Sequence, residues 1–148
     1  MRAVIQRVSR ASVTVDGEVI ARIGRGLVVL VGVAKTDGPT DTEYVASKVH
    51  GLRLFPDADG RLQHSVFDAG GSVLVVSQFT LLGDVRRGRR PSFDAAAPAG
   101  DARRTYEDLV ARLTAAGLDV ATGRFQAHMH VELVNDGPVT VIVDSQTR

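Results

Sequence analysis

The segment that constrains the fold most is residues 27–34, which are apolar almost without interruption. A strand with one solvated face alternates polar and apolar side chains, so an unbroken apolar run predicts a strand that is buried on both faces. Even this run is far shorter than the roughly 20 residues that a membrane-spanning helix needs. We therefore expect residues 27–34 to form a central strand of a globular domain.

The rest of the composition is consistent with one globular domain over residues 1–148. Hydrophobic residues make up 44% of the chain and charged residues 24%, which excludes wholesale disorder. The absence of cysteine excludes disulfides, thiolate zinc sites, iron–sulfur clusters and a cysteine nucleophile. Because the net charge is only +1, attraction to a polyanion requires local clustering of basic residues.

The N-terminal segment, residues 1–7, contains no apolar stretch typical of a signal peptide. The lack of cysteine also suits a reducing compartment. Together these features predict a soluble cytoplasmic protein.

Several further segments have strand character. Ala11, Val13 and Val15 alternate with polar residues, and Asp16-Gly17 is a strong hairpin signal. Residues 18–23 then form the returning strand. The other predicted strands are residues 72–76, 118–122, 130–134 and 139–143.

Two helices are predicted. Residues 40–43 have the spacing of a capping box, and Val45, Val49 and Leu52 then fall on one face of a helix over residues 41–51. A second helix covers residues 101–116, with Gly117 after its end. These elements predict a single compact α/β domain with a mostly antiparallel or mixed, barrel-like sheet and two main helices.

The first candidate site is Ser77-Gln78-Phe79-Thr80, where a buried strand runs directly into polar side chains. A strand end holds polar groups rigidly, and backbone N–H groups that leave a sheet can form an oxyanion hole. The simpler alternative is a strand end capped by polar side chains. Neither Ser77 nor Thr80 lies in a G-x-S-x-G motif, so the sequence does not favour a hydroxyl nucleophile.

The second candidate site is Asn135-Asp136-Gly137-Pro138, which lies between two predicted strands. Asn, Asp and Gly favour tight turns, so the tip of a hairpin is the simplest interpretation. Pro138 removes a backbone donor where the next strand begins, which restricts it to an edge or to the first position of a strand.

Charged and metal-binding residue types form two smaller groups. Arg86, Arg87, Arg89 and Arg90 share one long loop, residues 83–100, and must create a local positive patch that can pair with phosphates. The alternative is a solvated run of charges. His128 and His130 have the spacing of a metal-binding pair, but no third ligand is evident, which favours two ordinary histidines.

In their order along the whole chain, these motifs resemble the D-aminoacyl-tRNA deacylase family. The resemblance is carried by Gln6-Arg7-Val8 with residues 11–13, by residues 70–81, by Gly88 with Arg90-Pro91-Ser92-Phe93, and by residues 135–140. It implies a homodimer, with no cofactor and no metal, that hydrolyses the ester between a D-amino acid and the 3′-terminal adenosine of tRNA. Aminoacyl-tRNA and a second copy of the chain are the implied partners, and a membrane is not.

The resemblance also implies roles for individual residues. The backbone N–H groups of Phe79 and Thr80 would stabilise the oxyanion, Ser77 and Gln78 would orient the adenosine, and Met129 would form a wall of its pocket. Water assisted by the RNA would attack the ester.

Gly137 and Pro138 would form a cis dipeptide that reaches into the partner's active site. There its carbonyls would hold the α-amino group and exclude L side chains, although glycine would pass the same filter.

The chain departs from the family pattern at Gln126, where a small residue is common, and at His128, where an acid is frequent. Both changes affect the fine shape of the pocket. Two other functions stay open: a non-catalytic RNA-binding module built on the arginine loop, and a metal hydrolase built on His128 and His130.

Overall fold

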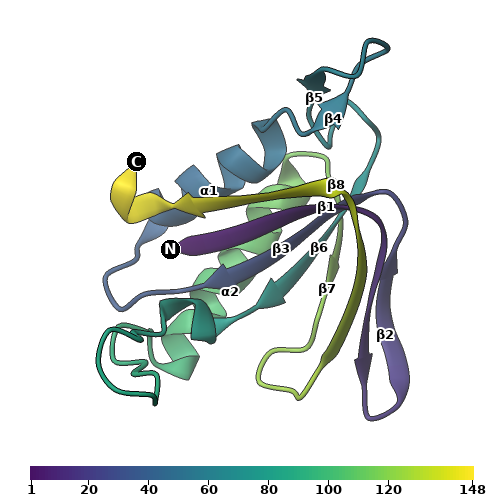
Figure 1. The fold of residues 1–148 in the computed structure, drawn as a ribbon. Helices are drawn as coiled ribbons and strands as arrows, with labels where there is room; N and C mark the ends of the chain where they lie inside the picture. Colours follow the sequence, from purple (N-terminus) through teal and green to yellow (C-terminus); the bar gives the residue numbers. More distant parts are fainter.

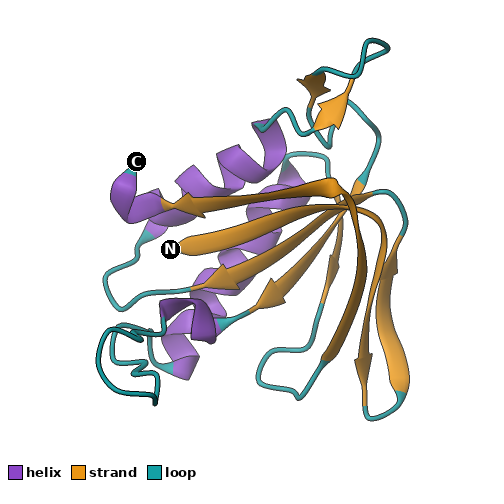
Figure 2. Ribbon diagram, viewed as in Figure 1, coloured by secondary structure: helices purple, strands orange, loops and turns teal.

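The computed structural model describes residues 1–148 and contains one curved mixed sheet with two long helices on one of its faces (Figures 1 and 2). The strands of the sheet run in the order β2 (Glu18–Ile23), β1 (Arg2–Val15), β3 (Gly26–Gly32), β6 (Ser72–Ser77) and β7 (Asp119–Thr122). The last strand, β8 (His130–Asp144), pairs with β1. These elements confirm the predicted α/β class.

The central strand was predicted correctly. β3 lies between β1 and β6, antiparallel to the former and parallel to the latter. Its odd-numbered side chains, such as Leu27 and Val29, face the helices, whereas Val28 faces a second, smaller core. This double burial explains why the sequence shows no alternation here.

The two halves of strand β1 pack into different hydrophobic cores. Ala3 and Ile5 belong to the core beneath the helices, whereas Val13 and Val15 belong to the smaller core. The pairing of β1 with β8 shifts register between Gln6 and Arg10, and such bulges bend a strand sharply. The bend folds the sheet over itself, so that β2 lies against β6 and β7 in a barrel-like arrangement.

The helix α1 (Pro39–Gly51) begins slightly earlier than its sequence predicts. The predicted capping box at residues 40–43 is wrong, because the backbone N–H of Gly38 donates to Asp41 Oδ2 at 2.9 Å and Pro39 occupies the first turn. Proline fits that position, since its missing N–H would have no partner within the helix.

The helix predicted over residues 101–116 is α2 (Ala99–Ala115), which buries Tyr106, Leu109 and Leu113. Gly117 follows its end, as predicted, with φ +89°. No helix of the structure has the length and apolar character needed to cross a bilayer.

The minor elements are a small hairpin of β4 (Phe55–Pro56) and β5 (Leu62–His64), and the short 3₁₀ helices η1 (Phe79–Leu82) and η2 (Ser145–Thr147). The hairpin stands out at the top of Figure 1, and the two termini lie close together. The N-terminal amine donates to Ser145 Oγ at 2.7 Å, which ties the start of β1 to the end of β8.

Candidate active site

A pocket of about 580 Å³ opens at the carboxyl ends of the parallel strands β3, β6 and β7. This is the edge of an α/β sheet at which ligands generally bind. Its lining residues are Val33 after β3, residues 76–79 at the end of β6, four alanines at 96, 97, 99 and 102, residues 125–129 after β7, and Val131. The predicted site residues Ser77, Gln78, Phe79 and Met129 thus share one cavity.

The polar rim of the pocket is fixed by the backbone at the end of β6. The N–H of Gln78 donates to the carbonyl of Val31 at 2.7 Å, which holds the chain beside β3 as it leaves the sheet. The chain then turns into η1, whose first residues are Phe79 and Thr80. N–H groups in the first turn of a helix have no partner within that helix. The N–H groups of Phe79 and Thr80 therefore have no partner within η1, and Phe79 lines the pocket.

Thr80 itself does not line the pocket, and its hydroxyl accepts a close hydrogen bond from the side-chain amide of Gln78. A hydroxyl that is to act as a nucleophile needs a hydrogen bond to a base instead. The side chain of Thr80 therefore holds the side chain of Gln78.

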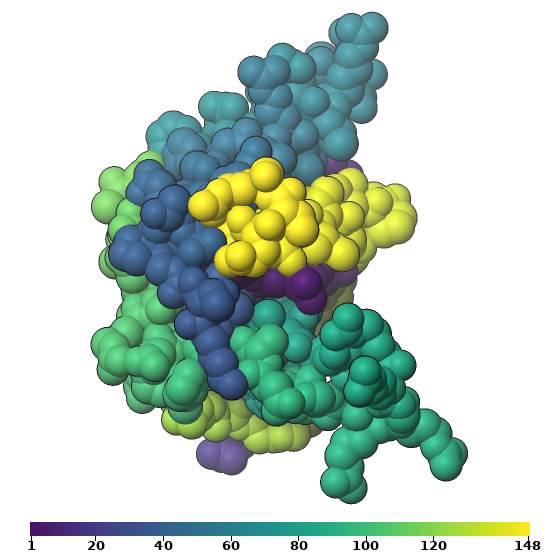
Figure 3. Space-filling model, turned by 90° about the vertical axis from the view of Figure 1, so that its left-hand side faces the viewer, coloured from purple at the N-terminus to yellow at the C-terminus, as the bar shows by residue number.

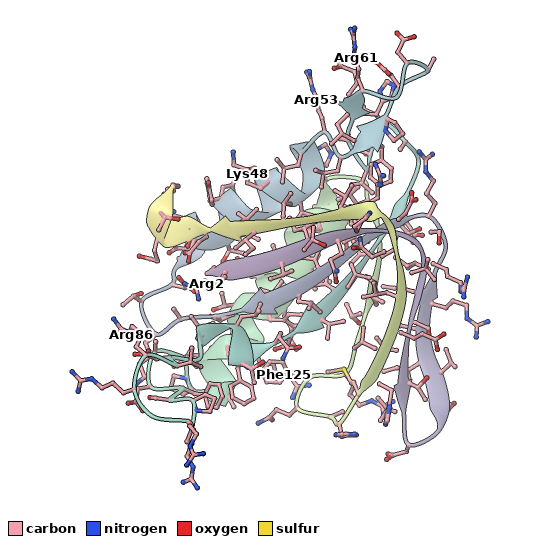
Figure 4. All side chains as sticks on the ribbon, in the orientation of Figure 1. Arg2, Lys48, Arg53, Arg61, Arg86 and Phe125 are labelled. Atoms are coloured by element: carbon pink, nitrogen blue, oxygen red, sulfur yellow. The ribbon has the colours of Figure 1, made fainter.

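The aromatic walls of the pocket come from distant parts of the chain. The exposed ring of Phe79 packs edge-on against Phe93 at 5.0 Å, which links η1 to the arginine loop. Phe125 belongs to the loop that joins β7 to β8, and Figure 4 places it near the end of β6. A Cβ at Gly123 would lie 2.7 Å from the sulfur of Met129, so only glycine lets Met129 close this wall.

The segment Asn135-Asp136-Gly137-Pro138 is not a hairpin tip, because it lies inside the single strand β8. The predicted pair of strands over residues 130–134 and 139–143 is one strand whose two halves pair with the same neighbour, β1. Residues 136–139 form an excursion opposite Arg7, between the pairs Gln6–Thr140 and Val8–Asn135. The Gly137–Pro138 peptide bond is cis.

Two side chains hold this excursion in place. Asn135 donates to the carbonyls of Arg7 and Val139, at 2.9 and 3.0 Å, and so clamps both of its ends. Arg7, only 8% exposed, donates to the carbonyls of Leu54 at 2.7 Å and of Asp136 at 3.1 Å.

The role of Arg7 was not predicted from the sequence. A signal was present, because Arg7 occupies an inward position in the alternation that begins with Ala3 and Ile5. A charged side chain at such a position requires buried partners.

Within a single chain, the excursion at residues 136–139 lies far from the pocket. Gly137 lies opposite Arg7 of β1, and Arg7 pairs with Leu27 of β3, which in turn pairs with Val73 of β6. The excursion is therefore three strands away from β6. Val73 also lies four residues before Ser77, the residue at the pocket. With about 4.8 Å between strands and about 3.3 Å per residue, the separation is on the order of 20 Å. The exposed Gly137 and Pro138 therefore lie outside the pocket of their own chain.

The arginine loop projects from the body of the protein, as the space-filling view in Figure 3 shows at the lower right. Backbone hydrogen bonds between Asp84 and Ser92 close its base. Arg86 forms two hydrogen bonds with Asp84, at 2.6 and 2.9 Å, and thereby lowers the pKa of that carboxyl to about 2. The remaining arginines of the loop, Arg87, Arg89 and Arg90, are exposed and form no ion pair.

His128 and His130 lie with their ring centroids 5.2 Å apart, near the start of β8. No group of three or more imidazoles and carboxylates in the chain is arranged to hold a metal ion. His128 lines the pocket beside Gln126, so both departures from the family pattern fall on its wall.

The structure is a compact α/β domain with a pocket at the carboxyl ends of its parallel strands. A family model described as D-Tyr-tRNA(Tyr) deacylase matches residues 4–144. A D-aminoacyl-tRNA deacylase of Symbiobacterium thermophilum is 60% identical over 99% of this chain and 97% of its own length. One from Thermotoga petrophila is 57% identical, over 98% and 97%. The chain belongs to the D-Tyr-tRNA(Tyr) deacylase family.

Solved structures agree on the fold. A protein titled c-Myc DNA Unwinding Element Binding Protein is 41% identical, with a TM-score of 0.92 over 97% of this chain and 98% of its own. A probable eukaryotic D-amino acid tRNA deacylase is 17% identical, with a TM-score of 0.83 over 96% and 97%, and shows the shared fold alone.

Proposed function

We propose that the protein hydrolyses the ester bond of D-aminoacyl-tRNA and releases the free D-amino acid and tRNA. The observation that carries this proposal is the convergence of Ser77, Gln78, Phe79 and Met129 on one pocket, in a chain 60% identical to a D-aminoacyl-tRNA deacylase. The pocket volume of about 580 Å³ suits a nucleoside with an attached amino acid.

The chemistry that we propose relies on positioning rather than on a protein nucleophile. Phe79, Met129 and Phe125 would enclose the terminal adenosine, while Ser77 and Gln78 would orient it. The N–H groups of Phe79 and Thr80 would stabilise the negative charge that develops on the ester carbonyl oxygen. An aminoacyl ester is already activated, so water assisted by the RNA itself suffices as the nucleophile.

The site is completed, in this proposal, by the Gly137–Pro138 excursion of a second copy of the chain. Two observations support a homodimer. The excursion is exposed and lies on the order of 20 Å from the pocket of its own chain by strand geometry. The strand β8 is also an edge, paired only with β1, and its Ile142 is 71% exposed. Long unprotected edges favour pairing with another chain.

A direct test measures deacylation of D-tyrosyl-tRNA and L-tyrosyl-tRNA that carry the same tRNA. We expect rapid release of D-tyrosine and a rate with the L-ester equal to the spontaneous rate. Equal rates on both enantiomers would rule out the chiral part of the proposal, and no turnover on either would rule out the hydrolase.

The arginine loop is expected to raise affinity for the RNA backbone. Arg87→Ala combined with Arg89→Ala should raise KM and leave kcat nearly constant, because neither arginine lines the pocket. Each lost phosphate contact should flatten the slope of log K against log salt by about 0.7–0.9. Arg86→Ala is the matched control, since Asp84 already neutralises that charge, and its effect should be smaller. An unchanged slope in the double variant would show that these arginines are only solvated and do not contact RNA phosphates.

Catalysis is expected to need no metal ion. Enzyme dialysed against a chelator should keep its rate on D-tyrosyl-tRNA, and His130→Ala should behave like the wild type, because His130 belongs to no group of three ligands. The measurement is initial rate before and after chelation. A rate that only added zinc restores would contradict the expectation and favour a metal hydrolase.

A further inference from the structure

A second cavity, of about 560 Å³, adjoins the pocket described above. It is formed between α2, which contributes Arg103, Tyr106 and Glu107, and the residues that follow β7. Phe125 lines both cavities, so a ligand in the pocket and a ligand in this cavity would be neighbours.

Hydrogen bonds to β6 hold one wall of the second cavity in place. The carbonyl of Val75 accepts hydrogen bonds from the hydroxyl of Tyr106 at 2.8 Å and from the backbone N–H of Gly123 at 3.1 Å. Burial raises the pKa of Tyr106 to about 12, so this hydroxyl stays protonated. Its ring lies 6.0 Å from that of Phe125 and supports it from behind. The strand β6 thus positions the second cavity as well as the first.

The charge of the second cavity is net positive. The guanidinium of Arg103 lies 5.7 Å from the centre of the Phe125 ring and forms an exposed ion pair with Glu107 at 3.2 Å. Arg124 is exposed and forms no ion pair or side-chain hydrogen bond. Two guanidiniums and one carboxylate around an aromatic ring favour an anionic, stackable ligand.

We infer that this cavity binds the nucleotide that precedes the terminal adenosine, with Arg103 and Arg124 on its phosphate and Phe125 beside its base. Basic side chains combined with an aromatic ring are the chemistry by which proteins hold single-stranded nucleic acid. The inference rests on the proposed function, because an adenosine in the first pocket is what places an RNA chain at the mouth of the second.

The test compares three substrates that carry the same D-tyrosyl ester: adenosine, the dinucleotide cytidylyl-adenosine, and tRNA. In the wild type, KM for the dinucleotide ester should be about tenfold lower than KM for the adenosine ester, the scale of one charge-assisted hydrogen bond. The variant with Arg103→Ala and Arg124→Ala should reduce this ratio to about twofold or less.

Arg104→Ala is the matched control. Arg104 is adjacent on α2 and pairs with Asp101, but it lines a different cavity, so the tenfold ratio should persist. Thermal unfolding of each variant shows that it is folded. A ratio near one in the wild type, or an unchanged ratio in the double variant, overturns the inference while the esters are still hydrolysed. Failure to hydrolyse any of the three esters would instead overturn the proposed function.

Discussion

Replacing Arg7 with alanine is expected to lower the free energy of unfolding by on the order of 3 kcal/mol and to abolish most activity. The guanidinium donates to the carbonyls of Leu54 and Asp136 from a nearly buried position. Without it, the buried carbonyl of Leu54 loses its partner, which costs about 1–3 kcal/mol, and the partly exposed carbonyl of Asp136 loses a hydrogen bond to a charged group, worth about 1.5–3 kcal/mol at most.

The loss of activity should exceed the loss of stability. Arg7 links the excursion at residues 136–139 to Leu54 next to β4, and also approaches Asp136 Oδ2 at 3.4 Å. Without that link the excursion can shift relative to the sheet. A displacement of about 1 Å at a substrate-positioning group can reduce a rate about 100-fold. Under the proposed function, hydrolysis of D-tyrosyl-tRNA should therefore fall by about that factor.

Two controls separate these effects. Arg7→Lys keeps the charge but offers no planar fork, so it should restore part of the stability and little of the activity. Arg10→Ala removes an exposed charge from the same strand and should affect neither. Urea unfolding gives the stability, and rates are compared at a temperature where every variant is folded. Wild-type hydrolysis by Arg7→Ala would show that the excursion plays no part in catalysis.

Much of the fold could be predicted because local and global signals agree. The apolar runs of β3 and β6 are buried on both faces, and the turn at Asp16 and Gly17 has positive φ at both residues, as a tight hairpin requires. The pocket residues Ser77 to Phe79 could be found in the same way, because a polar cluster directly follows a buried strand.

The remaining features of the fold and of the pocket could not be predicted, because they depend on contacts between residues far apart in the sequence. The turn-forming residues Asn135, Asp136 and Gly137 suggest a hairpin, yet β1 is long enough to pair with the segments on both sides of them, so they form an excursion within one strand. The alanines that line the pocket lack any chemical signal in the sequence. Their place is set by pairing of the loop with the end of β3, where the N–H of Ala97 donates to Val33 at 2.9 Å.

Replacing Gly137 with alanine is expected to reduce hydrolysis of D-aminoacyl-tRNA at least tenfold. The residue has φ +131°, a conformation that costs an L-residue about 1–3 kcal/mol. A Cβ there would also lie 2.8 Å from Val139 Cγ2 and 3.1 Å from Arg7 Nη2. The backbone must shift, and with it the carbonyls that, in the proposed function, hold the α-amino group.

Gly17→Ala is the matched control for the cost of positive φ alone. Gly17 has φ +78° in the turn between β1 and β2, and no atom lies within 4 Å of the position that a Cβ would take there. This variant should lose stability but keep its rate per folded molecule. Single-turnover hydrolysis of D-, L- and glycyl-tRNA by the wild type and both variants gives the comparison.

The relative rates on D-, L- and glycyl-tRNA test how the site distinguishes D from L amino acids. Backbone carbonyls accept hydrogen bonds from the ammonium group that D-, L- and glycyl esters all carry, so they cannot recognise a D side chain. Under the proposed function, selectivity would then come from steric rejection of the L side chain. The wild type should then hydrolyse glycyl-tRNA as well, and Gly137→Ala should slow the D and glycyl esters by the same factor. Rejection of glycyl-tRNA by the wild type would show that the site recognises the D side chain itself.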